Sequence, residues 1–275
     1  MISIFAAPSY IGRGYHAHVP LHATRLSSRI RAEEMSAYLG AKFNPTKGFK
    51  NDVCIHVKPR NIDNIRDGDW VDFLDSDRGV EAQLRAHPKV KVIAASQASY
   101  EYLKNRLPNE IVLIPSHHLN LERVKRKRRK ISVAGYIGSP SVEATKSYEK
   151  IAQQLKKVGY DFITCFDYKE RRDAINLYES IDLFIIDFWV DNRPHKIPTK
   201  IINAASFGIP TIAKPLLSYK ELEGYYIPAN NMSELLTEAK KFKDPTYYRQ
   251  WAKKVSAMAE KYHIEKIAKL YRKLS

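Results

Sequence analysis

Short runs rich in apolar and β-branched residues alternate with amphipathic helical patterns along most of the chain, and this alternation constrains the fold more than any other feature. ISIFAA at 2–7 and DVCIHV at 52–57 are typical of buried strands. Residues 24–39 have a helical pattern that places Ile30 and Met35 on one side. Because strands that alternate with helices form a mostly parallel sheet covered by helices, the sequence predicts an α/β fold.

The alternation is interrupted by the basic stretch RVKRKRRK at 123–130 and then restarts. The simplest organisation is therefore two α/β halves joined by a charged segment. Ser96 precedes a helical pattern and is a natural N-cap for it. The other expected strands span 70–75, 90–95, 111–115, 131–138, 161–166, 182–187, 210–213 and 225–229. The other expected helices span 78–87, 96–107, 141–157, 170–179, part of 193–210, 231–242, 245–261 and 264–273.

The net charge of +16 is unevenly distributed, since residues 123–130 alone carry seven basic side chains. Such a block is typical of proteins attracted to a polyanion, which here means an anionic membrane surface, nucleic acid or an acidic glycan. A solvated interdomain linker that is basic for no such reason is the alternative. Both interpretations stay open at the level of the sequence.

Length and composition narrow the class of protein. With 275 residues and 44% hydrophobic content, the chain can form one large or two compact domains. No apolar run approaches the roughly 20 residues of a membrane span, and MISIFAAPSY lacks the basic start of a signal peptide. Cys54 and Cys165 have neither disulfide nor zinc spacing, so we expect free thiols. We therefore expect a cytoplasmic protein, peripheral to the inner face of a membrane if the basic segment binds lipid.

RPHKIPTKIINAASFGIP at 193–210 gathers basic side chains around the start of a helical pattern. Ligands of open parallel sheets bind at the carboxyl ends of the strands, where loops meet helix N-termini. The turn GYIGS at 135–139 and the segment PLLSYKEL at 215–222 also follow expected strands. We expect the three segments to lie together, and their composition favours a site for a phosphorylated ligand.

PTKIINAASFGIPTIA resembles the donor-binding segment of GT-B glycosyltransferases of the family 4, or group 1, type. Members of that group often have Pro-x-Lys-aliphatic-x-Glu-Ala-x-Ala-x-Gly-x-Pro there, and Pro198, Lys200, Ala204, Gly208 and Pro210 are in register with it. GYIGS is similar to the first loop of the donor-binding domain, and DVCIHVKP and DWVDFLDSD are similar to segments of the amino-terminal domain. The resemblance implies an α/β GT-B fold, with two Rossmann-like domains facing each other across a cleft.

The resemblance also implies a domain organisation in which each region has its own role. The implied regions are an acceptor-binding Rossmann-like domain at 1–122, a basic linker at 123–130, a nucleotide-sugar-binding Rossmann-like domain at 131–250, and a C-terminal helix at 251–275 that packs back on the first domain.

In a transfer reaction of this kind, the departing nucleoside diphosphate gains negative charge. The resemblance implies that Lys200, with Arg193 or Lys196, binds its oxygens, with help from the Gly138 and Ser139 amides. A UDP- or GDP-sugar is the expected donor. We expect no cofactor and no metal, because cationic side chains bind the diphosphate oxygens. The implied catalytic residues are Lys200, Arg193, His16 and Asp75. The implied donor-binding residues are Gly135, Gly138, Ser139, Lys196, Thr199, Asn203, Ser218, Tyr219 and Glu221. The implied acceptor-binding residues are Gly12, Gly14, His18 and Arg29.

The chain departs from the family pattern at two positions. Many retaining members have two glutamates spaced by seven residues, where this chain has His195 and Asn203. A retaining enzyme needs no general base, whereas an inverting enzyme takes one from the first half, where the candidates are His16, His18, Asp75 and Asp77. Arg29 and Arg31 begin a helix that faces the cleft if the resemblance holds, and otherwise lies on a solvated face.

We therefore expect a glycosyltransferase that moves a sugar from a nucleotide-diphosphate sugar to a hydroxyl of a glycan, a lipid-linked saccharide or nucleic acid. DNA-modifying glucosyltransferases share the fold, so DNA is included among the acceptors. One alternative is a nucleic-acid-binding α/β protein without transferase activity, for which residues 123–130 and 17 tyrosines are the signal. Another is a GT-B protein that binds a nucleotide sugar and transfers nothing, which Asn203 permits.

Overall fold

The protein, seen in a computed structural model, divides into two compact units. The first comprises Met1–His117, Arg193–Ile197 and Ile264–Ser275, and the second comprises His118–Asn192 and Pro198–His263. The chain thus returns to the first unit for its last helix. The structure describes residues 1–6, 11–12, 22–23, 26–74, 78–126, 130–138, 142–166, 170–186 and 196–274.

The first unit is built on a parallel sheet with the order β4-β1-β5-β6-β7-β8 among the described residues. The central strands β1 and β5 pair from Ile2↔Val53 to Ala6↔Val57. Their apolar side chains, such as those of Ile4 and Ile55, are buried, as expected for strands covered by helices. The strands are β1 (Ile2–Ala6), β4 (Lys42–Phe43), β5 (Val53–Val57), β6 (Trp70–Phe73), β7 (Lys91–Ala94) and β8 (Ile111–Leu113), and a separate antiparallel pair consists of β2 (Ile11–Gly12) and β3 (His22–Ala23).

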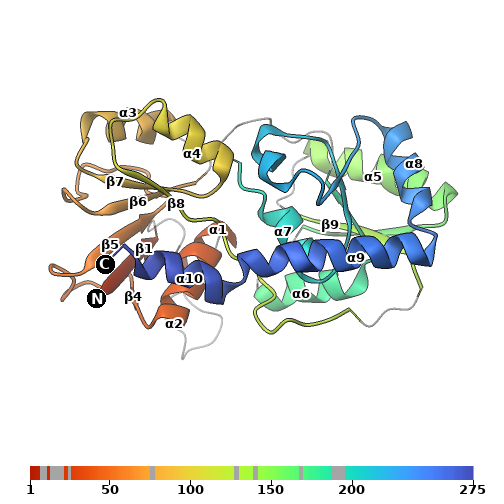
Figure 1. Cartoon of the computed structure of the whole chain (residues 1–275), viewed down its shortest axis with the longest axis horizontal. Helices are drawn as coiled ribbons and strands as arrows, with labels where there is room; N and C mark the ends of the chain where they lie inside the picture. Colours follow the sequence, from red (N-terminus) through yellow and green to blue (C-terminus); the bar gives the residue numbers. More distant parts are fainter. Residues whose placement is uncertain are drawn as a thin grey trace. The chain divides into compact units, whose positions relative to one another are not determined.

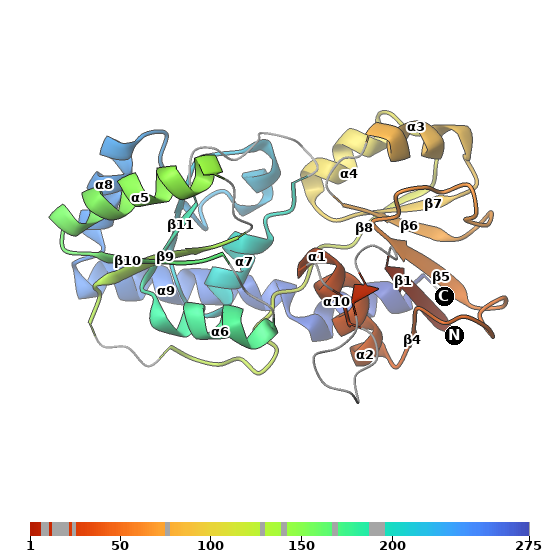
Figure 2. The ribbon, with the colours of Figure 1, turned by 180° about the vertical axis from the view of Figure 1, so that it is seen from behind.

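Helices cover both faces of this sheet (Figures 1 and 2). On one side, Leu84 of α3 and Leu103 of α4 pack with Val71 and Val92 in one apolar cluster. On the other side, α10 packs against α2, which continues the π-helical segment η2. The helical elements are α1 (Leu26–Ser28), η2 (Arg29–Glu34), α2 (Met35–Leu39), α3 (Arg78–Ala86), α4 (Gln97–Lys104) and α10 (Ile264–Arg272).

The second unit has a parallel sheet with the order β10-β9-β11-β12-β13 in the described chain. Strand β9 lies between β10 and β11, with pairs such as Thr164↔Tyr136 and Phe184↔Gly135. The strands are β9 (Val133–Ile137), β10 (Asp161–Cys165), β11 (Leu183–Ile186), β12 (Thr211–Ala213) and β13 (Ile227–Pro228).

Helices α5 and α6 lie on opposite faces of the second sheet (Figures 1 and 2). Helix α7 packs along α9, and together with the strands these helices enclose one large apolar core. The helical elements are α5 (Val142–Lys157), α6 (Arg171–Ser180), α7 (Thr199–Ser206), the 3-10 helix η3 (Leu217–Leu222), α8 (Met232–Lys241), α9 (Pro245–Ala259) and the 3-10 helix η4 (Glu260–Tyr262).

The predicted α/β fold with parallel sheets is confirmed. Ser96 caps α4 as expected, since its side chain accepts the backbone N–H of Ser99 at 3.2 Å. Cys54 and Cys165 are free thiols, as predicted. None of the helices in the described part of the chain combines the length and the hydropathy needed to cross a lipid bilayer.

Candidate functional site

The topology of the second sheet marks one position as a ligand site. Its order corresponds to 2-1-3-4-5 along the chain, so that β9 and β11 are neighbours from which the connections lead to opposite sides. In sheets of this order, ligands bind outside the carboxyl ends of these two strands. Tyr136 and Gly138 lie at the end of β9, and α7 is the helix that follows β11.

Helix α7 packs an apolar face into the core of the second unit, and its first turn contacts the end of β9 through Lys200. Ile201, Ile202 and Ala204 are buried, and Gly208 follows the helix with a φ of 72°, a left-handed conformation that suits glycine. At the start, Pro198 precedes Thr199, and no side chain caps the helix. The partial positive charge of the helix N-terminus therefore lies in the same turn as the Lys200 ammonium.

The Lys200 ammonium is held by Tyr136. Its Nζ donates to the Tyr136 hydroxyl oxygen at 2.5 Å and lies 4.5 Å from the centroid of the Tyr136 ring. Lys200 is half-buried, whereas the Tyr136 residue is 6% exposed. The end of β9 and the start of α7, which the sequence predicted to lie together, are therefore in direct contact through these two side chains.

The two glycines of the turn have steric roles in the structure. A Cβ at Gly135 would lie 2.6 Å from Cγ2 of Ile181, and a Cβ at Gly138 would lie 2.3 Å from the Tyr136 hydroxyl oxygen. The Gly138 N–H donates to the carbonyl oxygen of Cys165 at 3.2 Å. Gly138 thus leaves space for the Tyr136 hydroxyl. Its N–H is already hydrogen-bonded to β10 and not directed to a ligand.

The third predicted segment, η3, also approaches Tyr136. Tyr219 is 4% exposed, and burial followed by the nearby Tyr136 raises the pKa of its hydroxyl. Ser218 is buried beside it, and Glu221 is half-buried in the same 3-10 helix. Gly138, Lys200 and Tyr219 are therefore brought together around Tyr136.

Asn203 is held by the chain itself. It is 1% exposed, and its Oδ1 accepts the backbone N–H of Leu119 at 3.0 Å. The predicted hydrogen bond from this side chain to a ribose or sugar hydroxyl would have to use its remaining amino group. The structure therefore gives Asn203 a structural contact at the position where the family pattern has glutamate.

Among the other predicted residues, one directly precedes Lys200 in α7, others belong to the first unit, and the rest lie outside the described residues. Thr199 is half-buried at the start of α7, while Lys196 belongs to a short segment of the first unit. Gly12 lies in β2, and Arg29 begins η2 and is half-buried. Arg193, His16, Asp75, Ser139, Gly14 and His18, together with His195 and Asp77, lie outside the described residues.

Arg31 does not lie on a solvated face, which was one of the two alternatives from the sequence, because it is 1% exposed. Its Nε donates to Oδ2 of Asp72 at 2.5 Å, and both side chains are almost fully buried, at 1% and 0% exposed. The Tyr271 hydroxyl of α10 reaches the same carboxylate oxygen at 3.4 Å, and Ser116 accepts a bond from Arg31 at 3.2 Å. This cluster ties η2, β6 and α10 of the first unit together.

Part of the basic segment is also used inside the protein. Arg126 pairs with Asp182 at 2.9 Å, with 8% and 0% of the two side chains exposed, and it bonds to the Tyr248 hydroxyl. Arg123 pairs with Glu260 on the surface at 3.3 Å. At least two cations of residues 123–130 therefore have acidic partners within the second unit.

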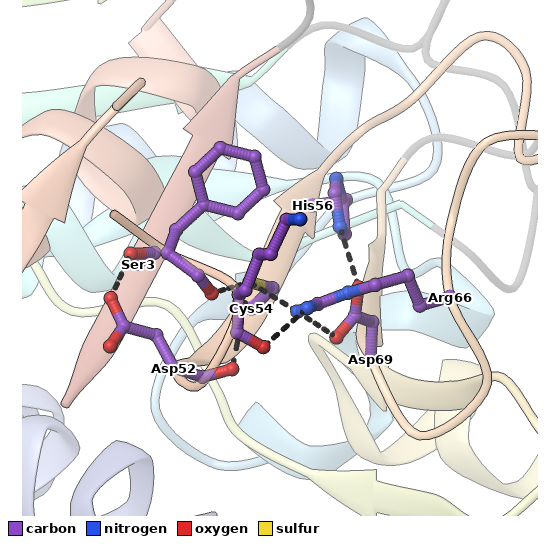
Figure 3. A network of polar contacts seen from close by, with 8 residues as sticks. Ser3, Asp52, Cys54, His56, Arg66 and Asp69 are labelled. Carbon is purple, nitrogen blue, oxygen red and sulfur yellow. Dashed lines mark hydrogen bonds and ion pairs between the residues drawn. The ribbon is translucent and has the colours of Figure 1, made fainter. Parts of the chain in front are cut away.

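A second polar cluster, in the first unit, surrounds Cys54 (Figure 3). Arg66 donates to Oδ1 of Asp69 and to the Cys54 sulfur, each at 2.9 Å, and His56 lies 3.5 Å from Oδ2 of Asp69. Burial, and then the Asp69 carboxylate, raise the pKa of the Cys54 thiol, so it is not a prepared nucleophile.

The place of this cluster in the sheet also indicates a structural role. Asp52, which accepts a bond from Ser3 at 2.7 Å, directly precedes β5, and Asp69 directly precedes β6 (Figure 3). The carboxylates therefore lie at the amino ends of the strands, opposite the edge where ligands of such sheets bind.

Sequence comparisons identify no relative. No protein-family model matches the chain, and no curated protein matches its sequence. Structure comparison does find matches. The pneumococcal O-GlcNAc transferase GtfA, in complex with UDP and GlcNAc, has a TM-score of 0.57 at 12% identity, over 82% of this chain and 52% of GtfA.

Two further solved structures are similar over most of this chain. TarM, of which an S. aureus structure is also matched, has a TM-score of 0.56 at 14% identity, over 80% of this chain and 54% of TarM. AviGT4, a glycosyltransferase involved in avilamycin A biosynthesis, has a TM-score of 0.57 at 9% identity, over 98% of this chain and 96% of AviGT4. The chain spans about half the length of GtfA and TarM.

At these identities the similarity concerns the fold. Two units with parallel sheets, each sheet covered by helices, match the corresponding architecture of glycosyltransferases. The predicted fold class is thereby confirmed. This chain has the GT-B fold.

Proposed function

We propose that the chain is a glycosyltransferase whose second unit binds a nucleotide-diphosphate sugar. The observation that carries this proposal is the position of Lys200, in the first turn of α7 and beside Tyr136 at the carboxyl end of β9. The fold supports it, because structures that share it belong to glycosyltransferases and two of them contain UDP.

The chemistry of the transfer requires positive charge at this position. The bond between the sugar C1 and the diphosphate oxygen breaks, and the acceptor oxygen forms a new bond to C1 as its hydroxyl proton passes to a base of the first unit in an inverting enzyme, or to the departing diphosphate in a retaining one. The departing diphosphate therefore gains negative charge in the transition state. Lys200 and the start of α7 stabilise that charge, and a pre-placed charge lowers the barrier because it favours the transition state over the bound substrate.

We propose a UDP- or GDP-sugar as donor, and transfer that proceeds without a metal because Lys200 supplies the positive charge. UDP-GlcNAc is the first donor to test, since GtfA is an O-GlcNAc transferase and one TarM complex contains α-GlcNAc-glycerol with UDP. The proposed acceptor is a hydroxyl of a glycan or lipid-linked saccharide, bound by the first unit.

One specific observation supports the hypothesis of a nucleic-acid-binding protein, namely the basic stretch at 123–130. Internal pairing of Arg123 and Arg126 weakens it, because these two cations already compensate Glu260 and Asp182. We therefore retain nucleic acid as an acceptor to test. Nucleic-acid binding without sugar transfer is the alternative function.

Donor turnover tests the proposal. Purified protein is incubated with UDP-GlcNAc, UDP-glucose, GDP-mannose and ADP-glucose, with and without EDTA, and the released nucleotide is measured in the presence of pooled glycan, lipid-linked and DNA acceptors. We expect release from one donor, undiminished by EDTA and lost in Lys200→Met.

The matched control is Lys240→Met, which removes an exposed lysine on α8 and should leave release unchanged. Nucleotide binding without release from any donor would support the protein that binds but does not transfer. Salt-sensitive retention on DNA without nucleotide binding would support the nucleic-acid reading.

A further inference from the structure

The geometry points to Tyr136 as the residue that positions Lys200 for the donor diphosphate. This inference rests on the proposed function, because it assigns Tyr136 a part in the same site. Tyr136 lies within the Gly-Tyr-Ile-Gly turn, and it is not among the site residues predicted from the sequence. It acts through Lys200, and we therefore regard it as a positioning residue rather than a catalytic one.

The contact restrains an otherwise flexible side chain. A lysine ammonium on its four-carbon stem loses up to about 2 kcal/mol of rotamer freedom when it is fixed, which weakens any bond it makes to a ligand. Here Nζ donates to the Tyr136 hydroxyl at 2.5 Å and lies 4.5 Å from the ring centroid. An ammonium has three donors, so two remain for phosphate oxygens after this bond. Tyr136 thus fixes Lys200 before the donor arrives and leaves it able to bind.

Tyr136 is itself held rigidly. Its ring stacks on Tyr148 with centroids 4.1 Å apart and is nearly parallel to Phe184 at 6.0 Å. Strand β9 fixes its backbone between β10 and β11, and Gly138 leaves the space that the hydroxyl occupies. A hydroxyl held in this way can restrain the Lys200 ammonium, whereas a water molecule or a surface side chain is too mobile to do so.

A structural role alone would give Tyr136 a different signature. A buried hydroxyl that only supports the fold contributes to unfolding free energy and leaves ligand affinity unchanged. A positioning hydroxyl changes affinity for a diphosphate, and only while Lys200 is present. The two roles are therefore separated by affinity measured in two backgrounds.

The experiment is a double-mutant cycle in which the affinity for UDP is measured by isothermal titration calorimetry. The variants are Tyr136→Phe, Lys200→Met and the double variant, each confirmed as folded by circular dichroism. We expect Tyr136→Phe to weaken UDP about tenfold, the scale of one hydrogen bond to a charged group, and to have no further effect in the Lys200→Met background.

Tyr160→Phe is the matched control. It removes a hydroxyl that donates to the Ala239 carbonyl oxygen at 3.0 Å, in the same unit but in the connection between α5 and β10. It should lower the urea midpoint as Tyr136→Phe does, without changing UDP affinity. Equal UDP affinity in wild type and Tyr136→Phe would overturn the inference, and so would equal weakening in both backgrounds, since Tyr136 would then act independently of Lys200.

A ligand-free measurement separates this inference from the proposed function. In protein labelled with ¹³C at lysine Cε, the Lys200 signal is assigned by its absence in Lys200→Arg. The nearby ring gives that signal a ring-current shift, and we expect the shift to decrease in Tyr136→Phe because the ammonium is no longer held. An unchanged signal would overturn the positioning role. If the signal changes but the protein binds no nucleoside diphosphate, the proposed function fails while the contact stands.

Discussion

The side chain of Asn203 accepts the backbone N–H of Leu119 at 3.0 Å and so binds the segment that enters the second unit. The same segment is held by Asn120, whose Nδ2 donates to the Ser206 carbonyl oxygen at 2.9 Å, and by Arg171, which donates to the Leu119 carbonyl oxygen at 2.7 Å. Asn203 thus fixes the chain at the position where the glycosyltransferase pattern that this segment resembles has glutamate.

Replacing Asn203 by alanine should destabilise the protein. The Leu119 N–H would lose its partner in a buried setting, which costs about 1–3 kcal/mol. Urea denaturation monitored by tryptophan fluorescence measures the change, and Asn203→Asp, which keeps an acceptor, provides the comparison. A large loss of nucleotide affinity with unchanged stability would instead make Asn203 a ligand-binding residue.

The Arg31–Asp72 pair should be much more sensitive to a single change than to a double one. Asp72→Leu leaves the Arg31 guanidinium buried without its partner, which costs about 3–5 kcal/mol. Replacing both residues, as Arg31→Met with Asp72→Leu, should recover most of that loss because no buried charge remains. Urea midpoints of the two variants test this, and a double variant as unstable as the single one would contradict it.

Asp69 should make stability depend on pH in the acid range. Burial alone would raise the pKa of Asp69, but the nearby His56 ring and then the bonds from Arg66 lower it below its ordinary value. Because the folded-state pKa is the lower one, this contribution is present above the unfolded value of about 3.9 and is lost as pH falls through the folded value.

Asp69→Asn should therefore be less stable than wild type at pH 7 and should approach it as the pH falls below about 4. Urea midpoints between pH 7 and pH 3 measure the difference. Asp67→Asn, which changes a mostly exposed carboxylate two residues away, is the control and should follow wild type. A constant difference between wild type and Asp69→Asn at every pH would refute the account.

The basic segment should separate into structural and solvent-facing cations. Arg126→Gln removes the partner of buried Asp182 and should cost about 1–3 kcal/mol, since two backbone N–H groups still bond that carboxylate. Changing exposed Lys125 and Lys130 to glutamine should leave stability unchanged.

If the segment binds a polyanion, that double lysine variant should also reduce the salt dependence of binding to duplex DNA by about two units of slope. Vesicles containing phosphatidylserine provide the second arm. Unchanged binding to both surfaces would remove residues 125 and 130 from any polyanion site.

Local pattern was sufficient for most of the fold. The strands and helices follow from apolar periodicity and caps such as Ser96, which are properties of neighbouring residues. The two-residue strand β4 (Lys42–Phe43) was missed because two residues have no periodicity. The segments of the candidate site could be predicted because glycine turns and helix starts are also local signals, and the contact between Lys200 and Tyr136 confirms that two of them lie together.

The missed residues depend on partners that are distant in sequence. Arg31 has the appearance of a solvated helix residue until Asp72, 41 positions later, provides a buried partner. Tyr136 has the appearance of an ordinary core aromatic, and only the fold brings Lys200, 64 positions later, to its hydroxyl. The pairing of Arg126 with Asp182 could not be predicted either, because nothing in a basic run indicates a partner 56 positions later.

The most direct test of the central claim is the affinity of the intact chain for UDP and GDP, measured by calorimetry in wild type and Lys200→Ala. We predict that one nucleotide binds to wild type and that its affinity falls at least about tenfold in the variant, because one charged hydrogen bond to the diphosphate is lost. Equal affinity in both proteins, or no binding of either nucleotide to wild type, would contradict a diphosphate site at Lys200.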